Sequence, residues 1–111
     1  MADRLLSRRI NVTDTDGEFV MDGVSGDSQT VLSVSICEIA AAAEVFNLWV
    51  SVAGGGTPFY IYKNQAIPAN ATFLHNEKIV IDDTDELWCS VASGTGSLDV
   101  IVSYLQQDDY V

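Results

Sequence analysis

Positive charge is scarce in this sequence. Its 111 residues include 5 lysines and arginines against 16 aspartates and glutamates, which gives a formal net charge of −11. A chain this acidic repels the phosphate backbone of nucleic acids and the anionic surface of membranes. We therefore expect neither nucleic acid nor a membrane among its partners.

Long apolar runs are also missing. No segment approaches the ~20 consecutive apolar residues that a membrane-spanning helix needs. The first nine residues, which include three arginines, lack the apolar stretch of a secretory signal peptide. We expect a chain that neither crosses a membrane nor is secreted.

Residues that carry catalysis are few. His75 is the single histidine, which we expect at the surface or in a turn, and no Gly-x-Ser-x-Gly sequence positions a nucleophile. The two cysteines, Cys37 and Cys89, each lie inside a strand-like run and are expected as buried thiols. A disulfide would require their strands to be neighbours. The sequence predicts no enzyme activity and no cofactor.

Acidic side chains gather at two turns. One cluster contains Asp14, Asp16 and Glu18, and the other contains Asp82, Asp83, Asp85 and Glu86. Calcium accepts such oxygens but takes about 6–8 of them, and the first cluster matches only a fragment of a calcium loop. We interpret both clusters as solvated turns and expect no metal, with calcium as the alternative.

Short alternating segments separated by Gly, Pro, Asn and Asp dominate the chain. About eight strands are expected, with a short extended piece over 18–21, and the strands cover residues 5–12, 30–38, 45–53, 59–63, 72–74, 78–81, 87–91 and 98–105. Hairpin tips are expected at 54–57 and 93–96, and residues 39–44 are expected as a hairpin connection or a single helical turn. The spacing predicts an all-β fold, a single antiparallel β-sandwich or jelly-roll-like domain.

The length allows one domain. Residues 1–13 are expected as a basic N-terminal arm and possible first strand, residues 14–106 as the sandwich, and residues 107–111 as an acidic, frayed tail. The basic character of the first segment comes from Arg4, Arg8 and Arg9. They are either an ordinary solvated terminus or an arm that docks on an acidic surface, such as a neighbouring copy.

Large apolar side chains also fall on the outward side of expected strands. Trp49, Ile101 and Leu105 lie opposite the core residues of their own strands. A second buried layer within the domain would explain them, and so would a subunit or capsid interface.

The C-terminal half resembles a known class of proteins. Residues 59–72 form a strand that ends in an Ile-Pro-Ala-Asn turn, and an acidic turn precedes the strand before residues 93–96. This succession resembles small β-sandwich virion proteins of tailed bacteriophages. The resemblance implies a structural component of the virion, most concretely a capsid decoration (cement) protein. Such a protein is a homotrimer that bridges subunits of the major capsid protein.

Two other functions stay open. A neck, tail or fibre-junction protein would form a ring, in which an acidic body could line a DNA channel without sticking to it. A carbohydrate-binding module, or a small hydrolase, would use Tyr60, Tyr62 and Trp88 as a sugar platform, because these aromatics alternate along strand faces. Oligomer number separates the first alternative from a decoration protein.

Overall fold

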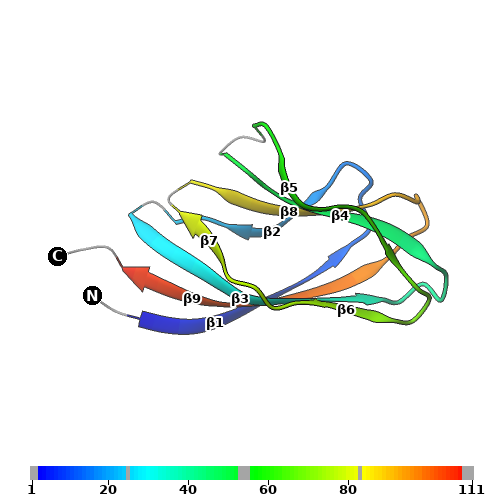
Figure 1. Cartoon of the computed structure of the whole chain (residues 1–111), viewed down its shortest axis with the longest axis horizontal. Coiled ribbons are helices and arrows are strands. Elements are labelled where there is room, and N and C mark those ends of the chain that lie inside the picture. The colour runs from blue at the N-terminus through cyan, green and yellow to red at the C-terminus, as the bar shows by residue number, and fades with distance from the viewer. Residues whose placement is uncertain (1–2, 25, 53–55, 83, 109–111) are drawn as a thin grey trace.

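The computed structural model describes residues 3–24, 26–52, 56–82 and 84–108, which form strands, turns and no helix (Figure 1). None of these residues therefore belongs to a helix that could cross a membrane. The strands are β1 (Asp3–Val12), β2 (Glu18–Asp22), β3 (Asp27–Glu38), β4 (Glu44–Ser51), β5 (Phe59–Ile67), β6 (Thr72–His75), β7 (Ile79–Asp82), β8 (Glu86–Val91) and β9 (Leu98–Asp108).

The strands form two antiparallel sheets that pack face to face. Sheet A has the order β1-β9-β3, with β6 and β7 both beside β3, and sheet B has the order β2-β8-β4-β5. β7 pairs with residues 28–31 of β3 and β6 pairs with residues 34–37, so the two are halves of one interrupted strand. The pairs β1–β9, β2–β8, β3–β6/β7 and β4–β5 are therefore nested, as in a jelly roll. The expected fold class is confirmed.

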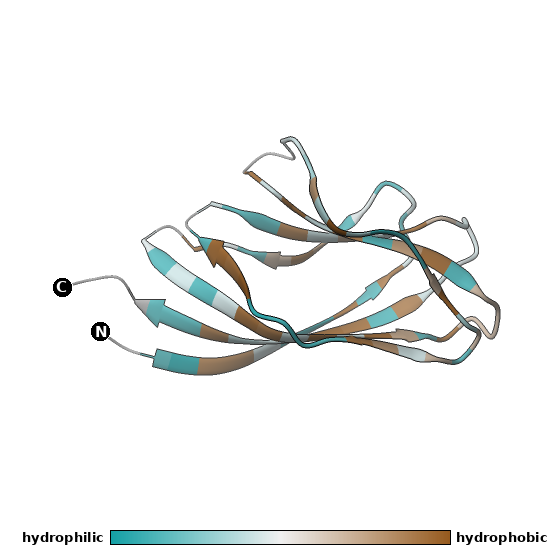
Figure 2. Ribbon diagram, in the orientation of Figure 1, coloured by the Kyte–Doolittle hydropathy of each residue, from teal (hydrophilic) through white to brown (hydrophobic). Residues whose placement is uncertain are grey.

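The core lies between the two sheets and follows the alternation of the strands (Figure 2). Phe46 and Leu48 of β4 are fully buried, as are Val100 and Val102 of β9. These four residues lie on the strand faces that the sequence predicts to be inward, because successive side chains of a strand point to opposite sides. The buried residues of both sheets form a single hydrophobic core between them.

The alternation fails at a bulge in β3. Strict alternation back from Val34 and Ile36 would place Leu32 inward, but the register with β9 shifts between Val31 and Ser33. Val31 is fully buried in its place, and Leu32 is only half-buried. A bulge adds one residue to one strand, so every side chain before it changes face.

Two connections differ from the prediction. The segments 39–44 and 93–96 are not hairpins, because each joins a strand of one sheet to a strand of the other. In the first, the carboxylate of Glu38 accepts the backbone N–H of Ala40 at 2.7 Å and of Ala42 at 3.2 Å. It also accepts the N–H of Asn70 at 3.0 Å, which ties this connection to the β5–β6 turn. β4 and β5 do form a hairpin, whose expected tip lies partly outside the described residues.

The N-terminal segment is part of the sandwich. β1 pairs with β9 over ten consecutive residues, from Asp3 to Val12, and forms an edge of sheet A. At the other end of the chain β9 continues to Asp108, so the expected tail begins inside a strand, and residues 109–111 lie outside the described part. The start of β1 and the end of β9 lie on the same side of the sandwich (Figure 1).

Candidate interaction surfaces

The outer face of sheet A carries apolar side chains in two cross-strand rows. The first row is Leu5, Leu105, Thr30 and Val80, and the second is Arg9, Ile101, Ser35 and Leu74. Leu5 is 75% exposed and Val80 58%, and in the second row Leu74 is 57% exposed. The rows lie on the side of the sheet that faces away from the core, and no described strand packs over them.

A row of serines separates the two apolar rows. Ser7, Ser103 and Ser33 face one another across β1, β9 and β3. Beside them lies a shallow hollow of about 340 Å³ that Leu5 and Leu32 also line. Small hydroxyl side chains between apolar rows leave a low, flat surface that another protein surface can approach closely.

Three of the six predicted interface residues come together on this face. Arg9 and Ile101 are direct cross-strand neighbours, and Leu105 pairs with Leu5 in the other row. Arg4 and Arg8 lie on the opposite side of β1, which is the side of Val12 and the core, although both side chains are exposed at the edge. Within the described part of the chain, no ion pair involves any of the three arginines.

Trp49 lies on the other side of the molecule, in a row of aromatic rings on the outer face of sheet B. The aromatic row consists of Phe19, Trp88, Trp49 and Tyr60, one from each strand of the sheet. The ring centroids are 4.2 Å apart for Phe19–Trp88, 6.1 Å for Trp88–Trp49 and 5.8 Å for Trp49–Tyr60. The two indole planes are parallel within 6°. Because the sheets face opposite ways, Trp49 cannot share one interface patch with Ile101 and Leu105.

The β1–β2 turn packs against this row. A Cβ atom at Gly17 would lie 2.7 Å from Cη2 of Trp49 and 3.3 Å from Cε3 of Trp88, and the φ angle of Gly17 is +111°. Glycine is required here both by the close approach and by the backbone conformation. The turn forms one wall of a groove of about 390 Å³, the aromatic groove, lined by Thr15, Asp16, Asn47, Trp49, Gly56, Pro58, Tyr60, Trp88 and Ser90.

Tyr62 is not part of the aromatic row. The register of β5 against β4 shifts between the Trp49–Tyr60 and Leu48–Tyr62 pairs, so Ile61 is an extra residue and Tyr62 turns toward the core side. Its hydroxyl lies 2.8 Å from Nδ1 of His75. The expected sugar platform of Tyr60, Tyr62 and Trp88 therefore keeps two of its members, and Trp49 takes the place of the third.

His75 is buried, contrary to the expectation of a surface or turn position. Nε2 lies 2.7 Å from the carbonyl oxygen of Glu77, which can only accept a hydrogen bond. A neutral ring with its proton on Nε2 donates to that carbonyl and accepts from the Tyr62 hydroxyl at Nδ1. Both ring nitrogens thus have structural partners that fix the β6–β7 interruption against β5.

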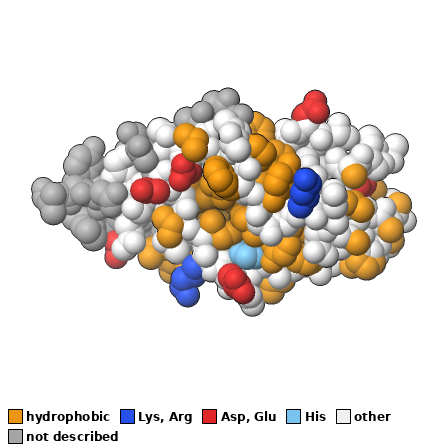
Figure 3. Space-filling model, turned by 45° about the horizontal axis from the view of Figure 1, so that its top comes forward, with side chains coloured by type: hydrophobic (Ala, Val, Ile, Leu, Met, Phe, Trp, Pro, Cys, Tyr) orange, Lys and Arg blue, Asp and Glu red, His pale blue; other side chains and the backbone are white. Residues whose placement is uncertain are grey.

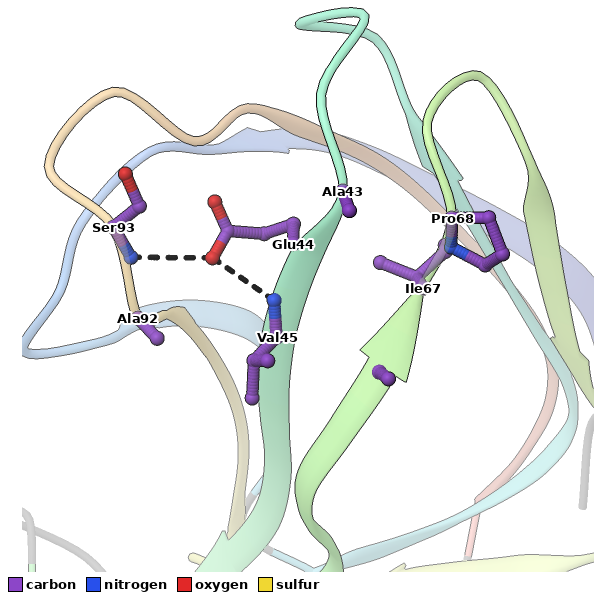
Figure 4. Close-up of a pocket in the computed structure, with 8 residues that line it drawn as sticks. Ala43, Glu44, Val45, Ile67, Pro68, Ala92 and Ser93 are labelled. Carbon is purple, nitrogen blue, oxygen red and sulfur yellow. Dashed lines mark hydrogen bonds between the residues drawn. The ribbon is translucent and has the colours of Figure 1, made fainter.

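A second hollow, of about 540 Å³, lies where β4 begins and β5 ends (Figure 4). Its lining is Ala43, Glu44, Val45, Ala66, Ile67, Pro68, Ala92 and Ser93. One carboxylate oxygen of Glu44 accepts the N–H of Val45 at 2.9 Å and of Ser93 at 3.1 Å. The only ionisable group of this lining therefore holds the β8–β9 connection in place, and it has no acid or base partner among the lining residues.

The two thiols lie in different sheets. Cys37 is half-buried in β3 and Cys89 is buried in β8, and both are free. Burial, reinforced by the negative charge of Glu18, raises the pKa of the Cys89 thiol to about 12. A thiol with such a pKa stays protonated and unreactive at neutral pH.

The acidic turns do not form a metal site in the described part of the chain, where no three His, Cys, Asp or Glu side chains are grouped to hold an ion. Oδ1 of Asp14 accepts the N–H of Asp16 at 2.8 Å, and Oε1 of Glu18 accepts the N–H of Thr13 at 3.1 Å. These carboxylates stabilise the turn itself. Asp83, of the second cluster, lies outside the described residues.

Hydrophobic side chains are also exposed along the side of the molecule that carries β5 and β7 (Figure 3). Phe59 of β5 is 64% exposed and Tyr60 is 47% exposed. The ammonium group of Lys63 lies 5.1 Å from the centroid of the Tyr60 ring, a cation–π distance. A charged side chain thus already covers part of the last ring of the aromatic row.

No protein-family model matches the sequence, and no curated protein matches it. The fold is similar to a solved structure of Bacillus endospore appendages, described as disulfide-linked pili, with a TM-score of 0.57, 7% identity, and coverage of 96% of this chain and 87% of that one. It is similar to the capsid structure of Helicobacter pylori bacteriophage KHP30, with a TM-score of 0.55, 11% identity, and coverage of 99% and 90%.

A third similar structure comes from the viral particle of infectious bursal disease virus (IBDV). Its TM-score is 0.51 at 11% identity, and the match covers 96% of this chain but only 35% of that one. Identities this low establish a shared fold and do not transfer a function, because one fold serves many functions.

Proposed function

We propose that this chain is a non-enzymatic structural protein of a virus particle that binds its neighbours through the outer face of sheet A. The observation that carries the proposal is the pair of apolar rows on that face, with Leu5, Val80 and Leu74 each more than half exposed. Large apolar side chains that are exposed together on one face of a small domain mark an interaction site, because leaving them in water is unfavourable.

Two further observations support a virion role. The nested strand order is that of a jelly roll, an architecture that recurs in viral capsids, and the bacteriophage KHP30 capsid chain matches 99% of this fold. The net charge of −11 disfavours contact with packaged nucleic acid, which suits a position on the outside of a shell.

The specific role that we propose is that of a decoration (cement) protein. In this role a homotrimer attaches to the outer shell and bridges subunits of the major capsid protein. Arg4, Arg8 and Arg9 would supply positive charge at the β1 edge, where they are exposed and free of ion pairs with described residues. Charge of this kind steers association with an acidic partner and fixes its orientation.

Binding to shells that lack the protein tests the proposal. The variant Leu74→Lys/Val80→Lys places two charges on the outer face of sheet A, where both side chains are exposed, so the fold should be retained. Burying an unpaired charge in an interface is costly. We therefore expect the variant to bind shells at least about tenfold more weakly than the wild type in co-sedimentation. The matched control is Phe59→Lys, an equally exposed position on sheet B, which should bind as the wild type does. Equal losses in both variants, or in neither, would contradict the proposed face.

A ring-forming neck or tail protein is the second candidate. The observation that favours it is the acidity of the chain, since a wall of like charge lets DNA pass without sticking. Oligomer number separates the two functions, because a closed ring around a tail axis has about six subunits and a shell tile of this kind has three.

A further inference from the structure

We propose that the aromatic groove on sheet B binds a neutral oligosaccharide. The groove lies on the face opposite to the apolar rows of sheet A, so this inference does not rest on the proposed virion role. Its floor is a two-by-two block of side chains in which Trp49 pairs with Trp88 and, two residues along each strand, Asn47 pairs with Ser90.

The block places an apolar surface beside a polar one at the spacing of a sugar ring. Two residues of a strand span about 6.8 Å, so the amide of Asn47 lies one such step from the indoles. A pyranose presents C–H bonds on its ring face and hydroxyl groups around its rim. A sugar in the groove lies against the aromatic row, with its rim hydroxyls toward the amide of Asn47 and the turn that carries Asp16.

Hydrogen-bonding capacity is left over in the groove. The Asp16 carboxylate and the Thr15 hydroxyl make no side-chain hydrogen bond with other described residues. Asn47 donates one amide hydrogen to Ser90 at 3.1 Å and accepts the backbone N–H of Asn64 at 2.8 Å, which fixes its orientation and leaves its second amide hydrogen. A fixed amide, a carboxylate and a hydroxyl together offer the donors and acceptors that sugar hydroxyls need.

The length and charge of the site narrow the class of ligand. The aromatic side chains that line the groove come from β8, β4 and β5, a width of about 10 Å at ~4.8 Å per strand, which fits an oligosaccharide better than a single sugar. Asp16 in the groove and the net charge of −11 disfavour acidic glycans. The indole planes are parallel within 6°, so they do not form the box of crossed rings that encloses a cation.

The test is a glycan array that carries neutral and acidic oligosaccharides, followed by titration of the best neutral glycan with tryptophan fluorescence as the readout. Tyr60→Ala removes an exposed ring at the end of the row, and we expect about fivefold to tenfold weaker binding, with a fold that is retained and a melting temperature lowered by only a few degrees. Phe59→Ala is the matched control, because Phe59 is the preceding exposed aromatic and is not a member of the row. It should bind with wild-type affinity.

Asp16→Ala separates the polar contacts from the ring contacts and should also weaken binding, since its carboxylate lines the groove. The proposal is overturned by an array without neutral hits or by hits among acidic glycans alone. It is also overturned if N-acetylarginine amide changes the fluorescence and no sugar does, because the groove would then be a cation site. Equal affinities of Tyr60→Ala and the wild type would place the sugar elsewhere.

Discussion

At the scale of single residues, Gly17 links the turn chemistry of the sequence to the surface of sheet B. An Asp-Thr-Asp-Gly sequence predicts a turn, and the structure adds that the glycine approaches Trp49 too closely for a Cβ atom. Its φ of +111° is a second reason why no other residue fits without strain. Glycine at this position therefore allows the β1–β2 turn to pack against Trp49 and form one wall of the aromatic groove.

We expect Gly17→Ala to lower the free energy of unfolding by about 1–3 kcal/mol, from backbone strain and the clash with the indole. Thermal unfolding by circular dichroism measures the loss, and the near-UV signal of the tryptophans should change with it. The control is Gly94→Ala, where a Cβ atom meets nothing within 4 Å. Equal unfolding free energies of the Gly17→Ala and Gly94→Ala proteins would show that the turn does not pack tightly against the tryptophans.

Glu38 is the residue that holds the alanine-rich connection 39–44 in a loop conformation. Its carboxylate collects three backbone N–H groups, and those hydrogen bonds, that of Asn70 above all, lower the pKa of Glu38 from its ordinary value of 4.5. Because the pKa is lower in the folded state, the stabilisation is complete above pH 4.5. It is lost as the pH falls through the folded value.

We expect Glu38→Gln to be less stable than the wild type at neutral pH, because an amide nitrogen cannot accept the N–H bonds that a carboxylate oxygen accepts. The difference in unfolding free energy should narrow as the pH falls below 4.5, since the wild type alone loses a charged partner. Urea unfolding of both proteins at about pH 7 and about pH 3.5 gives that difference. A difference that stays constant over this range would contradict the role of Glu38.

At the scale of elements, the strands with simple alternation are the ones that the sequence predicts well. Leu98, Val100 and Val102 of β9 are buried and Ile101 is exposed, as the period of two requires. The bulges at Leu32 and Ile61 break that period, and no local residue type announces them. Each reverses the face of a neighbouring side chain, so Tyr62 lies on the core side although alternation predicts it on the surface of Tyr60.

The connections show a second limit. The Ser-Gly-Thr-Gly segment has the turn chemistry of a hairpin tip, but it carries the chain from β8 in sheet B to β9 in sheet A. Turn residues determine that the chain reverses its direction, but they do not determine which of the two sheets the next strand joins. The burial of His75 cannot be predicted from its own neighbours in the sequence, because it depends on Tyr62 of another strand.

The edge strand β1 gives a prediction at this scale. Removing residues 1–9 deletes most of β1 and exposes the edge of β9, so we expect an unstable, aggregating protein. In contrast, Arg4→Ser/Arg8→Ser/Arg9→Ser changes only exposed side chains and should melt within a few degrees of the wild type. Circular dichroism melting of the two proteins checks both expectations. A truncated protein that unfolds cooperatively at the wild-type temperature would show that β1 is dispensable.

At the scale of the whole molecule, the two outer faces of the sandwich are chemically different. Sheet A presents apolar rows separated by serines, and sheet B presents the aromatic row and the aromatic groove. The proposals assign the first face to assembly and the second to a neutral oligosaccharide, so the molecule would be held by one side and remain open on the other. Sequence alternation locates the outward residues but not the sheet to which each belongs, so it cannot show that Trp49 and Ile101 face opposite ways.

The most direct test of the central claim is the mass of the protein in solution, measured by size-exclusion chromatography with light scattering, for the wild type and for Leu74→Lys/Val80→Lys. If the outer face of sheet A is an assembly surface of a decoration protein, the wild type is a trimer and the variant a folded monomer. A wild type that is monomeric at every concentration, or a variant that keeps the wild-type mass, would contradict the claim.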